Sequence, residues 1–119
     1  MKTVITFGTF DVFHVGHLRL LQRARKLGER LLVGVSSDAL NIAKKGRAPV
    51  YHQDDRMAII AGLACVDGVF LEESLEQKAE YLRGYGADIL VMGDDWAGKF
   101  DDFSCVCEVR SEERRVGKE

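Results

Sequence analysis

The feature that most constrains the fold of this chain is an alternation between short apolar runs and segments with helical spacing. Residues 3–7 and 31–35 are apolar runs of strand length, and residues 15–27 between them carry apolar side chains three and four positions apart. Three further strand-length runs are found at 66–71, 89–92 and 105–109. Strands that alternate with helices are typical of βα units. The sequence therefore predicts an α/β fold built on a parallel sheet.

The segments between the later runs predict two more helices and one long loop. One helix is expected to be capped by Asp54 or Asp55, and the next to begin at Ser74, whose spacing to Gln77 resembles a capping box. Residues 36–49 are polar and end in the only proline, so we predict a loop there with up to one helical turn. Loops of this length are commonly functional.

Length, charge and cysteine content exclude several classes of protein. The chain has 119 residues, which is enough for one domain, and its net charge of −2 gives no general attraction to nucleic acid or an anionic membrane. The 3 cysteines form no CxxC pair, so neither a disulfide framework nor a zinc site is indicated. No apolar run approaches the ~20 residues of a membrane helix. We expect a cytoplasmic protein without membrane insertion or a nucleic-acid partner.

The end of the chain breaks the pattern. Residues 110–119 are mostly charged, and Val116 is their only sizeable apolar residue. Such a stretch cannot bury itself. We therefore expect a domain over residues 1–109, followed by a solvated extension, a short exposed helix or a segment foreign to the domain.

The residues with the clearest chemistry lie between the first predicted strand and the first predicted helix. Segment 8–17 follows that strand directly, and ligands of open α/β sheets bind at the carboxyl ends of strands. His14 and His17 are spaced i and i+3 at a helix N-terminus, so both imidazoles reach the same side. Gly16 removes a side chain where a ligand would approach, and helix N-termini favour anions. The segment is suited to a nucleotide phosphate.

A histidine pair with this spacing has other interpretations. It also occurs as a helix N-terminal cap, as a solvated pair or as a metal site. An HExxH pattern is absent and no third ligand is implied, which disfavours the metal site. The phosphate-loop pattern GxxxxGK[ST] and the dinucleotide pattern GxGxxG are absent as well. A glycine turn after an apolar strand, with Thr9 and Asp11 inside it, favours phosphate chemistry.

Two stretches together carry a resemblance to a known family. The sequence Gly-Thr-Phe-Asp at 8–11, followed by His-Val-Gly-His at 14–17, resembles the HxGH nucleotidyltransferase family. The stretch 92–101, which reads MGDDWAGKFD, is similar to the glycerol-3-phosphate cytidylyltransferase branch of that family. The resemblance spans residues 1–109. It implies a Rossmann-like parallel sheet with helices on both faces, a homodimer, Mg2+ as cofactor, and a place in teichoic-acid-type polymer synthesis.

The resemblance also assigns roles to individual residues. It implies three catalytic residues, which are His14, His17 and Lys44. It implies nucleotide contacts by Gly8, Thr9, Phe10, Asp11, His14, Val15, Gly16, His17 and Asp94, and by a second loop base that is either Lys45 or Arg47. It implies acceptor contacts by Lys44, Lys78 and Trp96. Arg56 matches a recurrent arginine of the site or interface. Solvated or packed positions remain the alternative for Lys44, Lys78 and Trp96.

The implied reaction transfers CMP from CTP to sn-glycerol 3-phosphate and yields CDP-glycerol and pyrophosphate. The acceptor phosphate is already an anion, so attack on the α-phosphorus in line needs no covalent intermediate on the enzyme. Two alternatives remain. One is a cytidylyl- or adenylyltransferase for another phosphorylated alcohol or sugar. The other is a nucleotide-binding module without turnover, because residues 111–119 replace the C-terminal segment with which the family grips the triphosphate.

Overall fold

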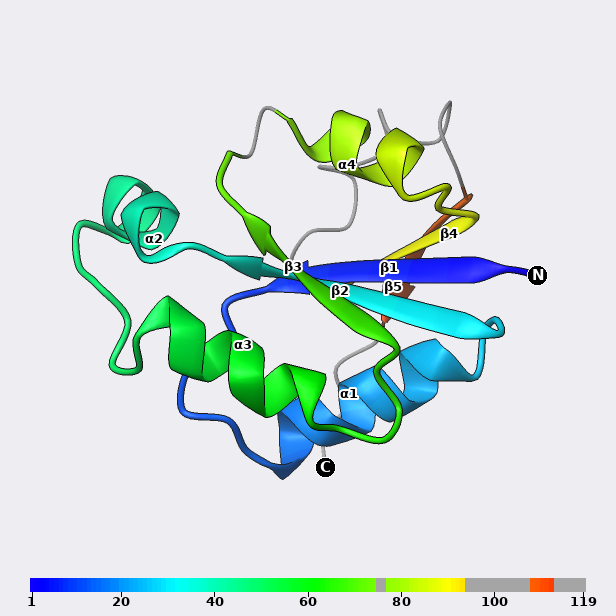
Figure 1. Cartoon of the computed structure of the whole chain (residues 1–119), viewed down its shortest axis with the longest axis horizontal. Helices are drawn as coiled ribbons and strands as arrows, with labels where there is room; N and C mark the ends of the chain where they lie inside the picture. The colour runs from blue at the N-terminus through cyan, green and yellow to red at the C-terminus, as the bar shows by residue number, and fades with distance from the viewer. Residues whose placement is uncertain (75–76, 94–107, 113–119) are drawn as a thin grey trace.

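The fold is organised around a five-stranded sheet in which every pair of neighbouring strands is parallel. The computed structural model describes residues 1–74, 77–93 and 108–112 (Figure 1). The sheet order is β3-β2-β1-β4-β5. The strands are β1 (Thr3–Gly8), β2 (Arg30–Ser36), β3 (Gly68–Glu72), β4 (Ile89–Gly93) and β5 (Glu108–Glu112). The predicted parallel α/β sheet is confirmed.

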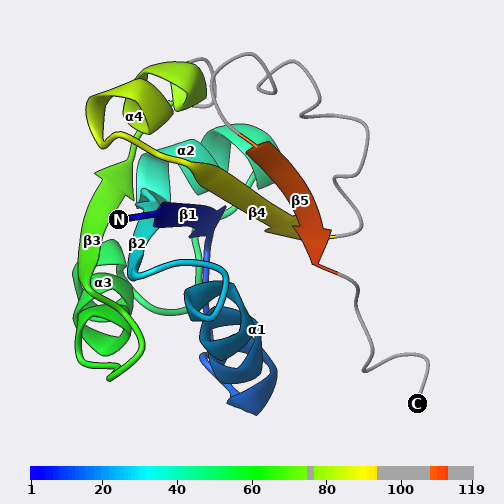
Figure 2. The ribbon, with the colours of Figure 1, turned by 90° about the vertical axis from the view of Figure 1, so that its right-hand side faces the viewer.

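Helices cover both faces of the sheet, as the Rossmann-like resemblance implies. Figures 1 and 2 show α1 (Val15–Arg25) and α3 (Gln53–Ala61) on one face and α4 (Lys78–Gly84) on the other. Each face has its own core, and neighbouring residues of β1 point into different ones: Val4 packs with Leu21 of α1, and Ile5 packs with Leu82 of α4. Because both faces are buried, the central strands are continuously apolar. Among the described residues, no helix is long and apolar enough to span a membrane.

The order of the strands fixes where a ligand site is expected. From β1 the chain continues to β2 and β3 on one side, whereas β4 pairs with the other side of β1, from Val4↔Ile89 to Thr6↔Val91. The direction of winding therefore reverses between β1 and β4. Open α/β sheets bind ligands in the crevice outside the carboxyl ends of the strands at such a switch point. The segment that follows β1 is the one with the histidine pair.

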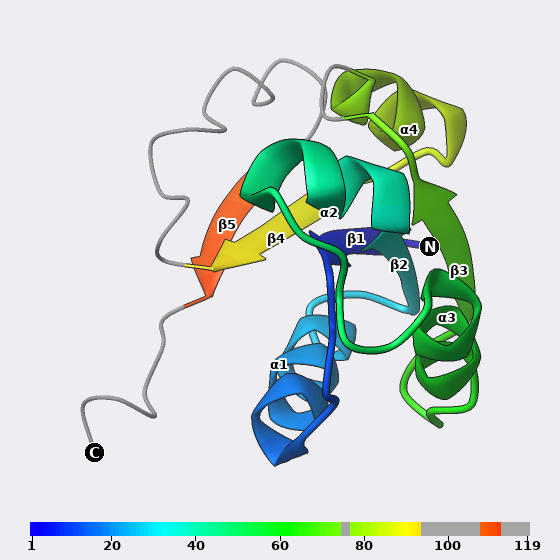
Figure 3. The ribbon, with the colours of Figure 1, turned by 90° about the vertical axis from the view of Figure 1, so that its left-hand side faces the viewer.

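The prediction of a loop over residues 36–49 was wrong, because most of this segment is helical. Helix α2 (Asp38–Lys45) lies beyond the carboxyl end of β2 (Figure 3). Ser37 caps it by accepting a hydrogen bond from the Leu40 N–H at 3.0 Å, and Gly46 ends it at φ 79°. Leu40 and Asn41 are its buried residues. The helix has only 8 residues, about two turns, which is too short for sequence periodicity to identify it as a helix.

Several predicted boundaries also differ from the structure. His52 caps α3 in place of Asp54 or Asp55. The described helix α4 begins at Lys78, with Gln77 as an N-cap residue that makes no side-chain cap bond, and residues 75–76 of the predicted capping box lie outside the described part of the chain. Strand β5 is described over Glu108–Glu112; residues 105–107 of the predicted strand, like residues 113–119, lie outside the described part of the chain. An edge strand pairs through its backbone on one side only, which lets the polar sequence at 108–112 form β5.

Candidate active site

The structure brings the two predicted histidines together at the start of α1. His14 is the N-cap residue, and its Nδ1 accepts a hydrogen bond from the Gly16 N–H at 3.0 Å. The His14 N–H in turn donates to Nδ1 of His17 at 3.2 Å. The centroids of the two rings lie 4.0 Å apart. The pair therefore forms a helix cap, which was one of the alternatives that the sequence allowed. It also places two imidazole rings side by side, each accepting a backbone N–H at Nδ1.

These two hydrogen bonds determine which ring nitrogen carries the proton. A neutral imidazole has one N–H donor and one acceptor nitrogen, and in both rings Nδ1 is the acceptor. The proton of each neutral ring is therefore on Nε2, which remains as a donor for a ligand. Burial, and secondarily the charge of His14, lower the pKa of His17 below its usual 6.5. His17 is thus a neutral N–H donor at neutral pH.

Glycine is required at two positions of this segment by close contacts. A Cβ on Gly16 would lie 2.7 Å from Cε1 of His14, so this glycine makes room for the histidine ring. A Cβ on Gly8 would lie 2.7 Å from the ring of Phe10. Both glycines therefore allow the aromatic and imidazole rings of the turn to pack against its own backbone.

The turn itself is strained. Phe10 and Val12 have positive φ angles of 53° and 48°. Left-handed backbone is uncommon for residues other than glycine and is unusual for a β-branched residue such as Val12. The buried ring of Phe10 meets His17 edge-on with centroids 5.6 Å apart, and Phe13 contacts His17 at 5.4 Å. The strained turn thus places two aromatic rings that fix the orientation of the His17 imidazole.

A cavity of about 740 Å³ opens beside this turn, which is within the size range of small-molecule sites. His17 lines it, whereas the exposed ring of His14 stacks beside His17. Both candidates for the second loop base, Lys45 and Arg47, line the cavity. Its lining also includes four other predicted nucleotide contacts, which are Gly8, Thr9, Phe10 and Asp11. The end of β1, the turn at residues 8–17 and the basic segment, residues 44–50, thus share one cavity.

The site includes polar residues that sequence reasoning missed. Asn41 is 1% exposed and lines the cavity; its Oδ1 accepts a hydrogen bond from Thr9 Oγ1 at 3.0 Å, and its Nδ2 donates to Ser36 Oγ at 2.9 Å. Thr9 Oγ1 also lies 3.0 Å from Ser36 Oγ. This network fixes the Thr9 hydroxyl at the cavity. The only sequence signal was a Ser-Ser pair directly after a buried strand.

Arg56 joins the segments that surround the cavity. Its side chain is fully buried, with 0% exposure. It donates from Nη1 to the carbonyl oxygens of Thr9 at 2.9 Å and Ser36 at 2.8 Å, and from Nε to that of Tyr51 at 2.9 Å. Nη2 forms an ion pair with Asp38 at 2.6 Å. The arginine predicted for the site or interface therefore lies under the site and holds its loops together.

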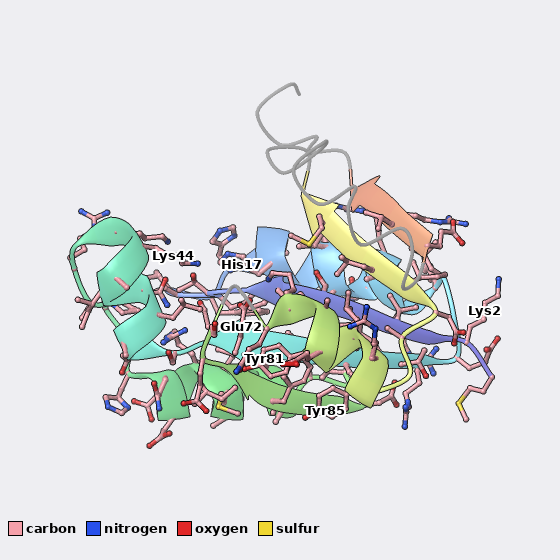
Figure 4. All side chains as sticks on the ribbon, turned by 90° about the horizontal axis from the view of Figure 1, so that it is seen from above. Lys2, His17, Lys44, Glu72, Tyr81 and Tyr85 are labelled. Carbon is pink, nitrogen blue, oxygen red and sulfur yellow. The ribbon has the colours of Figure 1, made fainter. Side chains whose placement is uncertain are left out.

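The two predicted acceptor lysines lie near one buried carboxylate. Lys78 is 3% exposed, its Nζ is 2.5 Å from Glu72 Oε2, and it lies 3.7 Å from the centroid of the Phe7 ring. Burial lowers the pKa of Lys78, although Glu72 opposes this. Partial desolvation also lowers the pKa of Lys44, which Glu72 again opposes. Figure 4 shows Lys44 toward the end of the molecule opposite Lys2, with His17 and Glu72 between Lys44 and the middle of the molecule.

Two predicted site residues, Asp94 and Trp96, lie outside the described part of the chain. Strand β4 ends at Gly93, directly before them. Within residues 1–74, 77–93 and 108–112, no group of three or more His, Cys, Asp or Glu side chains is placed to hold a metal ion. The described part of the site presents an imidazole, His17, and two cationic side chains, Lys45 and Arg47, to the cavity.

Comparison with known proteins agrees with this site. The family model described as cytidylyltransferase-like matches residues 5–117. A glycerol-3-phosphate cytidylyltransferase of Bacillus subtilis strain 168 is 46% identical over 110 residues, which cover 92% of this chain and 84% of that protein. One of Staphylococcus aureus strain NCTC 8325 is 39% identical over 109 residues, which cover 92% and 82%.

A solved structure supports the same assignment. The lipopolysaccharide core biosynthesis protein from Thermoplasma volcanium GSS1 superposes with a TM-score of 0.78 at 27% identity, over 96% of this chain and 98% of that one. The sheet order, the paired histidines after β1 and the sequence relatives thus lead to one conclusion. The chain belongs to the cytidylyltransferase-like family and is a cytidylyltransferase.

Proposed function

We propose that this cytidylyltransferase transfers CMP from CTP to sn-glycerol 3-phosphate, giving CDP-glycerol and pyrophosphate. Two observations support this choice of substrates. Relatives at 39–46% identity carry the name of this activity. The cavity also combines an N–H donor from His17 with the cationic side chains of Lys45 and Arg47, which suits a polyanionic nucleotide.

The observation that carries the proposal is the fixed tautomer of the histidine pair. Because both Nδ1 atoms accept backbone N–H groups, His14 and His17 hold their Nε2–H groups ready before a substrate binds. In the proposed step an oxygen of the acceptor phosphate forms a bond to the α-phosphorus, and the bond from that phosphorus to pyrophosphate breaks. Charge accumulates on the α-phosphate oxygens in the transition state. Preorganised donors stabilise such charge without the cost of reorganisation.

Cationic side chains would overcome the repulsion between the two anionic substrates. Lys44, at the end of α2, is assigned to the attacking phosphate, and Lys45 or Arg47 to the phosphates of the nucleotide. Lys78 is paired with Glu72 inside the protein, so its net charge is compensated there. We therefore expect Lys78 to help position the acceptor and to add little net positive charge to the site. Positioning of reactants is a large part of catalysis in phosphoryl transfer.

Mg2+ belongs to the proposal as an ion carried by the nucleotide. The described residues offer no cage of acidic and histidine ligands, and Mg2+ usually keeps waters and binds substrate phosphates together with one or two carboxylates. When bound, the ion would neutralise charge on the departing pyrophosphate. The chain's own part is to receive the nucleotide phosphates with Lys45 or Arg47 and with the turn at 8–17.

The proposal is tested by pyrophosphate release from purified protein. CTP with glycerol 3-phosphate is compared with ATP and glycerol 3-phosphate, and with CTP and other phosphorylated alcohols or sugars. We expect turnover with CTP and glycerol 3-phosphate, and a kcat/KM for this pair that is at least tenfold higher than for every other pair of substrates. Faster turnover with ATP or another acceptor would favour the related transferase, and CTP binding without pyrophosphate release would favour a binding module.

Three further properties belong to the same proposal. We propose a homodimer, a cytoplasmic location and a role in supplying CDP-glycerol for teichoic-acid-type polymers. Sedimentation velocity over a range of protein concentrations tests the dimer. A sedimentation coefficient that corresponds to the 13.3 kDa chain at every concentration would exclude it.

A further inference from the structure

The Asp11 carboxylate contacts a segment that is distant in sequence. Its Oδ2 accepts a hydrogen bond from the Val50 N–H at 2.7 Å, and its Oδ1 accepts one from the Tyr51 N–H at 2.8 Å. Val50 is the last residue of the basic segment 44–50, which carries Lys45 and Arg47. Both oxygens of Asp11 are thus used to connect the strained turn to the end of the basic segment.

A second contact holds the same point from the other side. The Tyr51 carbonyl oxygen accepts a hydrogen bond from Arg56 Nε at 2.9 Å, and Arg56 Nη1 donates to the Thr9 carbonyl oxygen at 2.9 Å. The N–H of Tyr51 is therefore bound by Asp11, which belongs to the turn, and its carbonyl oxygen by Arg56, which also contacts the turn. The turn and the basic segment are joined at two places.

The turn needs such support because of its conformation. Phe10 and Val12, on either side of Asp11, both have positive φ angles. Strained backbone persists only where the surrounding structure fixes it. Although burial opposes the effect, the N–H groups of Tyr51 and Val50 lower the pKa of Asp11. The carboxylate is therefore ionised at neutral pH, and charge-assisted hydrogen bonds of this kind are stronger than neutral ones.

We propose that Asp11 is a positioning residue, which holds the basic segment 44–50 against the turn so that Lys45, Arg47 and His17 face one cavity. This role rests on the proposed function for the reaction that it serves. It differs from the direct nucleotide contact that the family resemblance implies for Asp11. Its consequence is that the cations of the segment lose their positions relative to His17 when the two hydrogen bonds are removed.

The first experiment measures amide hydrogen exchange at Val50 and Tyr51 in the full chain. Asp11→Asn is expected to speed exchange at both amides by about tenfold or more, because protection reports the stability of local structure. Asp55→Asn is the matched control, since it removes the same charge from an exposed side chain of α3. Unchanged exchange at both amides in Asp11→Asn would overturn the proposal.

The second experiment removes a donor and leaves Asp11 in place. Val50→Pro deletes the N–H that Asp11 binds, whereas Val50→Ala keeps it and is expected to retain the protection of Tyr51. A positioning role predicts that Val50→Pro and Asp11→Asn both lower kcat/KM for CTP by about a hundredfold. The contrary result would be that Val50→Pro keeps the kcat/KM of Val50→Ala while Asp11→Asn loses activity. Asp11 would then act by direct contact with the ligand, and the proposal would be contradicted.

The two experiments also separate this proposal from the proposed function. If the parent protein releases no pyrophosphate with CTP and glycerol 3-phosphate, the substrate assignment fails, while the exchange comparison still decides whether Asp11 joins the two segments. Circular dichroism and urea unfolding confirm that each variant is folded. Should Asp11→Asn not fold, Val50→Pro carries the test by itself, through hydrogen exchange at the Tyr51 amide and through kcat/KM.

Discussion

The rings of His14 and His17 lie 4.0 Å apart, and the His14 backbone N–H donates to Nδ1 of His17 at 3.2 Å. The same two residues therefore cap the N-terminus of helix α1 and are the ones that we propose to contact the nucleotide phosphate. Backbone N–H groups hold both Nδ1 atoms, so the chain itself selects the Nε2–H tautomer. The local structure of a helix N-terminus thus sets the chemistry of the site.

Replacement of His17 by alanine is expected to lower kcat by about a hundred- to a thousandfold, the usual loss for one preorganised donor to a developing anion. Pyrophosphate release measures this, and circular dichroism is expected to show an intact fold. Arg19→Ala, on the exposed face of the same helix, serves as the control. A His17→Ala protein with near-parental turnover would refute the assigned role.

Stability is expected to fall as the pH decreases below neutrality, in part through His17. Burial lowers its pKa in the folded state, so between the usual value of 6.5 and the lowered value the unfolded chain binds more protons at this residue. The contribution of His17 is fully present above pH 6.5 and is lost as the pH falls toward its folded pKa. Urea unfolding at several pH values measures this, and His17→Gln is expected to show a smaller slope over the same window. An equal slope in both proteins would argue against the buried, neutral His17.

Arg56→Ala is expected to destabilise the protein by about 3 kcal/mol. It removes four hydrogen bonds, including the ion pair with Asp38, from a buried site. Arg56→Lys keeps the charge but not the branched guanidinium, so an intermediate loss is expected. The free energy of unfolding in urea gives both values. A Lys variant as stable as the parent would show that charge alone matters at this position.

The Glu72–Lys78 pair offers a test of a buried charge. Glu72 is 2% exposed and Lys78 is 3% exposed, so Glu72→Gln leaves a buried cation beside a neutral amide. The expected cost is about 3–5 kcal/mol. The double variant Glu72→Gln with Lys78→Met removes that charge and is expected to recover part of the lost stability. A double variant whose loss equals the sum of the two single losses would mean that the pair is not coupled.

Sequence reasoning predicted the parts of the fold that depend on local pattern. The parallel sheet follows from continuous apolar runs such as residues 31–35 of β2, where Leu31, Val33 and Val35 are fully buried. The histidine pair follows from its i, i+3 spacing at a helix start. Helix α2 was missed because its 8 residues are fewer than the roughly 11 over which helical periodicity can be recognised.

The contacts at the site that sequence reasoning could not predict depend on partners far away in the chain. Asn41 meets Thr9 and Arg56 meets the same residue's carbonyl, across separations of 32 and 47 positions. Lys78 lies on a short helix that reads as exposed, yet β3 places Glu72 beneath it. Such contacts arise from the three-dimensional arrangement of strand ends, which no local spacing records.

The most direct measurement is nitrogen NMR of the three histidine side chains, with and without CTP. We expect both His14 and His17 to carry their proton on Nε2 in the free protein. We also expect these two Nε2 signals to shift when CTP is added. His52, the cap residue of α3, serves as the internal reference. A proton on Nδ1 of either residue, or Nε2 signals that do not respond to CTP, would contradict the assignment of this pair to the nucleotide phosphate.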